Sequence, residues 1–240
     1  MILVVGSSSY GSVLTHLNEI VYANGLKELA SIGVDVAEID MVMFTGGEDV
    51  HPDLYSGSDP DHMSGTNKSR DIREMELFEE LKRLEVKITG ICRGFQFINV
   101  MAGGEMYQHV FNHAGMVHEI YYPATEHLSA AMSTHHQMVK PDDLAIPVAW
   151  SVPSRSHAYW GPKGVIAREK PFHEIESAIF PNINGFGVQY HPEMMREDTE
   201  GRQYYLKLIA DFYNMDLGTF TDMYGGIDEW RGKVKTTSTE

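Results

Sequence analysis

The 240-residue sequence predicts an α/β protein built on a mostly parallel sheet. In the first half, short apolar segments rich in β-branched residues alternate with amphipathic segments of helical period, as in parallel sheets covered by helices. In the second half, strand-like segments follow one another closely, which is typical of antiparallel or mixed strands added to such a sheet. We therefore expect one large sheet with parallel strands first and antiparallel strands later.

Apolar spacing places the individual elements. Strands are expected at residues 1–5, 41–44 and 87–91, and helices at 13–21, around 26–29, at 71–85 and from 93 to about 101. Further strands are expected at 119–122, 127–131, 148–152, 165–167, 175–180 and 186–190, and a last helix at 203–213. Residues 1–230 are expected to form a single domain, followed by a polar tail at 231–240.

Composition restricts the function classes. The formal net charge of −15 disfavours binding to nucleic acid or to anionic membranes. A single cysteine excludes a disulfide framework and fits a reducing compartment. The apolar start of the chain ends at Gly6, too early for a secretory signal, and no segment approaches a membrane span. We expect a cytoplasmic protein.

The single cysteine lies where a predicted strand turns into a predicted helix. The segment reads Gly90-Ile91-Cys92-Arg93-Gly94, with a small residue on each side of the cysteine, as a sharp strand-to-helix turn requires. Such a turn places Cys92 at a helix N-terminus, where free N–H groups and the helix dipole favour a thiolate. A buried structural cysteine is the alternative, and the paired glycines favour a nucleophile.

A second segment supplies a base for that nucleophile. An apolar strand leads into His191-Pro192-Glu193, and the proline favours an extended conformation at His191. In an extended chain, residues two apart point the same way, so Glu193 can orient the His191 ring. A nucleophile, a base and an orienting carboxylate form a catalytic triad.

Acyl transfer also needs donors for an oxyanion. The backbone N–H of Arg93 is one candidate, because it follows the nucleophile at the start of the helix. The other candidate is the loop at Gly46 and Gly47, which closes a predicted strand. An ordinary turn at this loop is equally compatible with the sequence.

These segments together resemble the class I glutamine amidotransferase superfamily, and within it the γ-glutamyl hydrolase branch, including the γ-glutamyl-GABA hydrolases. The resemblance rests on residues 90–104 around Cys92, on residues 187–193, on 46–55 (GGEDVHPDLY), on Arg70-Asp71, and on 133–137 (STHHQ). It extends from about residue 41 to about residue 194.

The resemblance implies a flavodoxin-like three-layer sandwich and hydrolysis of a γ-glutamyl amide through a γ-glutamyl thioester. By position, Cys92 corresponds to the nucleophile, His191 to the general acid and base, and Glu193 to its orienting residue. The family's oxyanion-hole and substrate-binding positions fall on the residues Gly47, Arg93, Gly46, Gln96, His136 and Gln137. Neither a metal nor an organic cofactor is implied, and the expected substrate is a small γ-glutamyl compound.

Two alternatives remain from the sequence. The chain could instead be the glutaminase subunit of a two-component amidotransferase, with a separate synthetase that accepts ammonia as its partner. A homodimer is also compatible with the sequence.

His109, His113 and His118 are spaced as metal ligands can be, but we expect them on the rim of a substrate cleft or on the surface, since no acidic or cysteine ligands are near in sequence.

Overall fold

The computed structural model describes residues 1–226 except 60–61, 164–165, 168–169 and 172. In this described part, the main sheet has nine strands. Their spatial order is β2 (Ile20–Tyr22), β1 (Ile2–Val5), β3 (Met41–Phe44), β4 (Lys87–Ile91), β13 (Gly185–Val188), β12 (Ile175–Phe180), β10 (Ile146–Ser151), β7 (Ala114–Tyr122) and β8 (His127–Thr134).

The sheet changes character at β13. The strands from β2 to β13 run parallel to their neighbours. Those from β13 to β8 pair antiparallel. The predicted α/β class, with parallel strands followed by antiparallel ones, is confirmed. Because β4 and β13 are parallel neighbours, the loops that follow them leave the same edge of the sheet.

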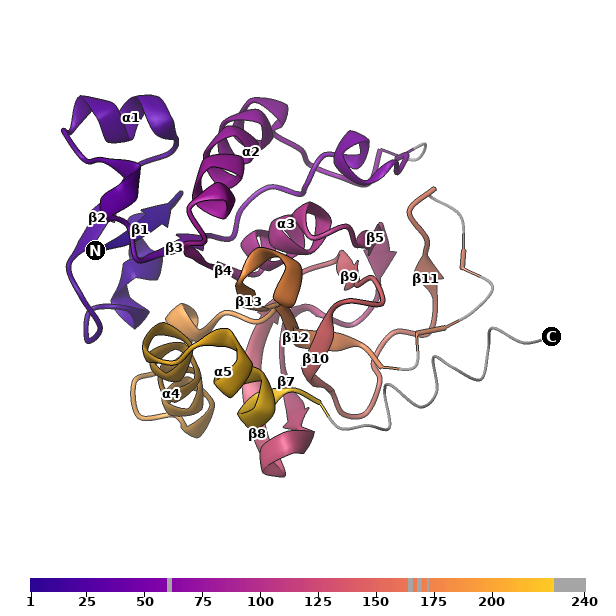
Figure 1. Ribbon diagram of the computed structural model, residues 1–240. Helices are drawn as coiled ribbons and strands as arrows, with labels where there is room; N and C mark the ends of the chain where they lie inside the picture. The colour runs from indigo at the N-terminus through magenta and orange to yellow at the C-terminus, as the bar shows by residue number, and fades with distance from the viewer. Residues whose placement is uncertain (60–61, 164–165, 168–169, 172, 227–240) are drawn as a thin grey trace.

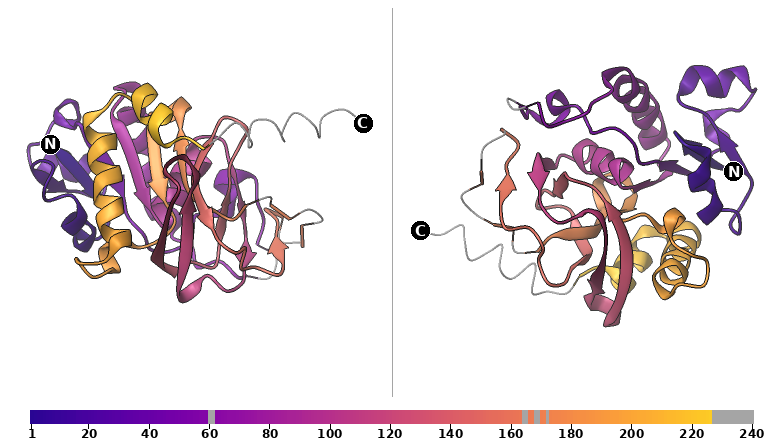
Figure 2. Two further views of the ribbon diagram at one scale, coloured as in Figure 1. Left: turned by 90° about the horizontal axis from the view of Figure 1, so that it is seen from below. Right: turned by 180° about the vertical axis from the view of Figure 1, so that it is seen from behind.

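Helices cover both faces of the sheet (Figures 1 and 2). On one face lie α1 (Leu26–Ser31), α2 (Lys68–Arg83) and α3 (Arg93–Met101), and on the other lie α4 (Glu200–Asn214) and α5 (Leu217–Tyr224). Alternate residues of β1 belong to two core clusters: Leu3 and Val5 to the cluster that includes α2 and α3, and Ile2 and Val4 to the cluster that includes α4 and α5. All four side chains of β1 are therefore buried, as expected for a parallel strand covered on both sides.

The helix predicted at residues 13–21 is wrong. A 3₁₀ helix, Ser8–Val13, occupies its start, and strand β2 occupies its end. Ile20 pairs with Ile2, so β2 covers the edge of β1 that would otherwise be open. The apolar residues at this helical spacing are used in two separate places, with Val13 in the core and Ile20 on the edge strand.

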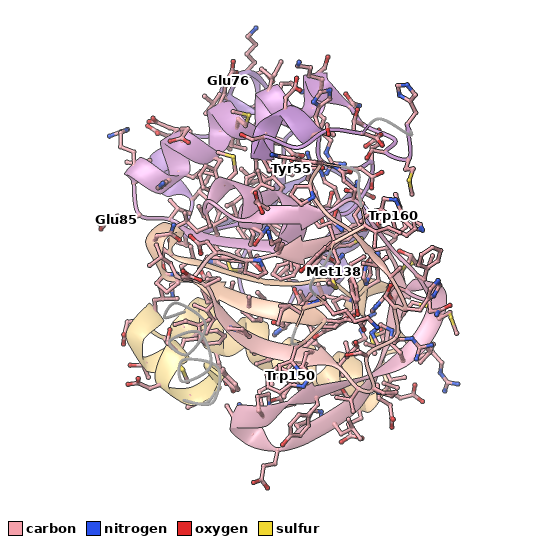
Figure 3. The ribbon with its side chains drawn as sticks, turned by 90° about the vertical axis from the view of Figure 1, so that its right-hand side faces the viewer. Tyr55, Glu76, Glu85, Met138, Trp150 and Trp160 are labelled. Carbon is pink, nitrogen blue, oxygen red and sulfur yellow. The ribbon has the colours of Figure 1, made fainter. Side chains whose placement is uncertain are left out.

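Several short elements were not predicted. They are α5 and two small sheets, one made of β5 (Glu105–Tyr107) and β9 (Met138–Lys140), the other of β6 (His109–Val110) and β11 (Tyr159–Trp160). In Figure 3, Met138 of β9 lies between Tyr55 and Trp150. The strand predicted at 165–167 falls partly, and the tail at 231–240 entirely, outside the described residues. In the described part of the chain, no helix is both long and apolar enough to cross a membrane.

Candidate active site

Cys92 occupies a strained turn between β4 and α3. Its backbone angles are φ 53° and ψ −110°, a region that residues with a side chain rarely adopt. The N–H of Cys92 donates to the carbonyl of Val188 on β13, and the Cys92 carbonyl accepts from Gln96 in the first turn of α3. The turn is thus fixed by the sheet on one side and by the helix on the other, as a nucleophile elbow requires.

The flanking glycines are required for close packing. A Cβ atom at Gly94 would lie 1.9 Å from the carbonyl oxygen of Phe44, and one at Gly90 would lie 2.4 Å from the main chain of Gly94. The small residues predicted on both sides of the cysteine therefore let α3 approach the neighbouring strands closely.

His191 and Glu193 follow β13, beside the cysteine turn. The Nδ1 atom of His191 lies 2.6 Å from Oε1 of Glu193, and both side chains are buried. The two side chains meet as predicted, but not through an extended segment, because Pro192–Met194 forms a 3₁₀ helix that starts directly after His191. Because Glu193 holds Nδ1, Nε2 is the ring nitrogen that remains for other partners, one of which is the Thr134 hydroxyl at 2.7 Å.

The groups around His191 favour its protonated form, the imidazolium. Burial lowers the pKa of His191, but hydrogen bonds to Cys92 and Glu193 outweigh burial and raise the pKa to about 10. Because Cys92 contributes to this shift, its side chain lies near the His191 ring. A protonated His191 can donate a proton to a leaving group, which is the role of the acid beside a cysteine nucleophile.

The loop after β3 lies against the same histidine. A Cβ atom at Gly46 would lie 3.3 Å from Cε1 of His191 and 2.2 Å from the hydroxyl of Tyr10. Gly47 has φ +142°, which other residues adopt only with strain. The backbone at both glycines, which carries no side chain, therefore lies at the edge of the sheet where Cys92 and His191 lie.

The sequence profile of the peptidase C26 family matches residues 20–193. The chain belongs to the peptidase C26 family. The matched region contains Cys92, His191 and Glu193, together with the glycine loop.

The chain is also similar to individual curated proteins and solved structures. Protein NtpR of Enterococcus hirae is 28% identical over 176 residues, which is 66% of this chain and 69% of NtpR. A Lactococcus lactis protein, YvdE, named as glutamine amidotransferase-like, is 30% identical over 122 residues, half of each chain. A solved glutamine amidotransferase from Thermotoga maritima covers 92% of this chain and is itself covered to 93%, with a TM-score of 0.54 at 12% identity, which shows a shared fold.

Two side chains that the sequence analysis did not assign, Thr134 and Tyr10, contact His191. Thr134, at the end of β8, lies within the predicted STHHQ segment, although no role was assigned to it. The Tyr10 hydroxyl lies 3.5 Å from Nδ1 of His191. Burial, followed by the nearby Glu193 and Cys92 charges, raises the pKa of Tyr10, which keeps the phenol protonated. Its position in the loop after β1, at the same sheet edge, is the signal that could have identified it.

The side chain of Arg93 is directed toward helix α2. It is buried and paired with Asp71 and Glu74 of α2. Glu74 also accepts from Nε of Arg70 at 2.6 Å, and Arg70 in turn donates to the carbonyl oxygens of Thr45 and Gly46 at 3.0 and 3.1 Å. An ionic network therefore joins the cysteine turn to the glycine loop through α2, so the two predicted oxyanion donors share one support.

The predicted substrate-binding residues divide into two groups. The amides of Gln96 and Gln137 are buried and used within the protein: Gln96 donates to the Gln137 carbonyl at 3.1 Å, and Gln137 donates to Ser64 and Gln108. His136 keeps a side-chain exposure of 34% and lies 3.0 Å from Asp49. Of these three, His136 is the residue that solvent and ligands can reach.

Proposed function

We propose that this protein is a cysteine-dependent hydrolase that cleaves the γ-glutamyl amide bond of a small metabolite. The observation that carries the proposal is the meeting of Cys92, His191 and Glu193 at one edge of the sheet, with the Glu193 carboxylate 2.6 Å from the His191 ring. The match to a peptidase family supports amide hydrolysis, and the amidotransferase-like relative supports a glutamyl side chain as the acyl group.

The reaction follows from the positions of these groups. The Cys92 thiolate attacks the side-chain carbonyl, and the resulting oxyanion accepts from the backbone N–H groups of Gly47 and Arg93. His191 donates its proton to the departing amine, leaving a γ-glutamyl thioester on the sulfur. His191, now neutral, takes a proton from water, whose oxygen attacks the thioester and releases glutamate and the free thiolate. Glu193 stabilises the imidazolium in both steps.

The polar end of the glutamyl group is expected to meet a separate set of residues. His136 and Asp49 form the reachable polar pair next to the loop after β3. The pKa of His136 is raised, chiefly by its hydrogen bond to Asp49. The protonated, positively charged form of His136 is therefore favoured. We assign the pair to contact with the polar groups of the glutamyl moiety, and we assign Gln96 and Gln137 to the support behind it.

The test is glutamate release by the purified chain alone, offered glutamine and a panel of γ-glutamyl amines. We expect turnover of at least one γ-glutamyl compound, and a covalent glutamyl adduct detected by mass spectrometry of rapidly quenched enzyme. Cys92→Ala should abolish both, while its thermal unfolding remains that of the wild type. Wild-type turnover in Cys92→Ala would refute the assignment of the nucleophile.

The same assay separates the alternative of a glutaminase subunit. A chain that is inactive alone, but hydrolyses glutamine once a synthetase partner is added, would be the glutaminase of a two-component amidotransferase. Steady turnover without a partner supports the free-standing hydrolase.

A further inference from the structure

A buried cluster of histidine and glutamate side chains lies apart from the catalytic triad. Its members are His113, His118, His135, Glu174 and Glu176, and none is more than 4% exposed. They come from three places: the residue before β7 and the middle of β7, the turn after β8, and the residue before β12 with the start of that strand. The expectation that His113 and His118 lie on a cleft rim or on the surface is therefore wrong, because the strands fold them into the interior.

Glu174 is an ionised carboxylate with a full set of donors. It accepts from the Ser151 hydroxyl at 2.6 Å, the Tyr159 hydroxyl at 2.7 Å, and the backbone N–H groups of Arg155 and Ser156 at 2.6 and 2.7 Å. Nε2 of His113 lies 3.2 Å from its Oε2. Because an ionised carboxylate only accepts, Nε2 of His113 carries a proton.

The tautomer of His135 is fixed in a similar way. Its Nδ1 lies 2.7 Å from the carbonyl oxygen of Gln137, so Nδ1 carries the proton and donates it. In their neutral forms, His113 and His135 therefore present unprotonated Nδ1 and Nε2 atoms, respectively. A hydrogen bond from one ring nitrogen to a carboxylate or a main-chain carbonyl is how metal-bound histidines are held in proteins.

Both free nitrogens face the carboxylate of Glu176. Nδ1 of His113 lies 3.4 Å and Nε2 of His135 lies 3.7 Å from Oε1 of Glu176. Neither nitrogen has a hydrogen-bond partner within the described residues, and Oε2 of Glu176 has none there either. Three electron-pair donors that converge in a buried place need a proton or a cation between them.

We propose that His113, His135 and Glu176 bind a divalent transition metal ion, with Zn²⁺ as the ion that suits two imidazoles and a carboxylate. The three ligand atoms lie within 4.8 Å of one another. Ligand bonds of about 2.0–2.2 Å in a tetrahedral site separate ligand atoms by about 3.3–3.6 Å, close to the two separations from Glu176. Nε2 of His118 donates to Oε1 of Glu176 at 2.8 Å and orients the carboxylate.

The position of the site gives it a structural role. The ion joins β7, β12 and the turn after β8, which are distant in the sequence. His135 directly follows Thr134, whose hydroxyl contacts the catalytic histidine, and directly precedes His136. The ion would therefore hold the segment that supports one side of the active site without contacting the reacting atoms.

The test is metal binding by the full chain, measured independently of enzymatic activity. The chain is stripped with a chelator, dialysed against ZnCl₂ or CoCl₂, and its metal content determined. We expect about one ion per chain, visible Co²⁺ absorption of a site with nitrogen ligands, and a higher thermal midpoint with Zn²⁺ than without. His135→Gln and Glu176→Gln should each lower the metal content at least tenfold, while His16→Gln, an exposed histidine, should leave it unchanged.

Two results would overturn the proposal. One is a wild-type chain that binds neither Zn²⁺ nor Co²⁺ and shows no metal-dependent shift in its thermal midpoint, in which case a protonated histidine neutralises Glu176. The other is metal content equal to that of the wild type in well-folded His135→Gln and Glu176→Gln. Should either variant fail to fold, the absorption of the wild-type Co²⁺ protein and its loss with chelator decide the matter.

Discussion

Glu74→Gln should destabilise the protein strongly, because Glu74 joins two arginines in a buried place. One of its oxygens pairs with the fully buried guanidinium of Arg93, and the other lies 2.6 Å from Nε of Arg70. The substitution keeps the shape of the side chain but removes its charge. Among the residues that the structure describes, Asp71 is then the one carboxylate still paired with the buried charge of Arg93.

The magnitude follows from the cost of an uncompensated charge. Breaking one partner of a buried ion pair typically costs about 3–5 kcal/mol in the free energy of unfolding. Asp71 keeps part of the compensation, so we expect a loss of about 3 kcal/mol, at the lower end of this range. For a chain of this size, that loss corresponds to a decrease in the thermal midpoint of about 6–12 °C.

The assay is urea and thermal unfolding of the wild type, Glu74→Gln and a control. Glu76→Gln serves as the control, because Glu76 is an exposed residue of the same helix, and we expect a change of about 0.5 kcal/mol or less. If Glu74→Gln unfolds at the same urea concentration as Glu76→Gln, the network does not stabilise the fold and this reasoning is refuted.

Three further predictions concern the active site. Glu193→Gln removes the charge that helps to raise the pKa of His191 to about 10, so the alkaline limb of the kcat/KM profile should move to lower pH; an unmoved limb would contradict this role. Gly94→Ala places a methyl group 1.9 Å from a main-chain oxygen of β3 and should cost about 1–3 kcal/mol in unfolding free energy, whereas Gly65→Ala, with no atom within 4 Å, should be nearly neutral. Thr134→Val removes the hydroxyl 2.7 Å from His191 and should lower kcat by about tenfold with an unchanged thermal midpoint; an unchanged kcat would show that the ring needs no such partner.

Local features of the sequence determined the parts of the site that depend on short spacings. The glycines two residues before and after Cys92 indicate a tight turn from the sequence, and Gly90 acts within that turn, whereas Gly94 also makes room for Phe44 of the neighbouring strand β3. The short spacing of His191 and Glu193 lets their side chains meet, although the chain reaches this contact through the 3₁₀ helix Pro192–Met194 and not through the extended segment that the sequence predicts. Alternating apolar segments likewise specified the α/β class and the parallel first half of the sheet.

Tertiary structure decided which segments, distant in the sequence, come into contact. Residues 13–21 carry a helical apolar pattern, yet the open edge of β1 takes Ile20 into a strand, since pairing with an existing sheet satisfies more backbone groups than an isolated helical turn. Glu174 and Glu176 were absent from the predicted site residues, because they lie about sixty residues from the histidines that they meet. Local spacing cannot report such contacts; they arise when antiparallel strands bring separate parts of the chain into one buried layer.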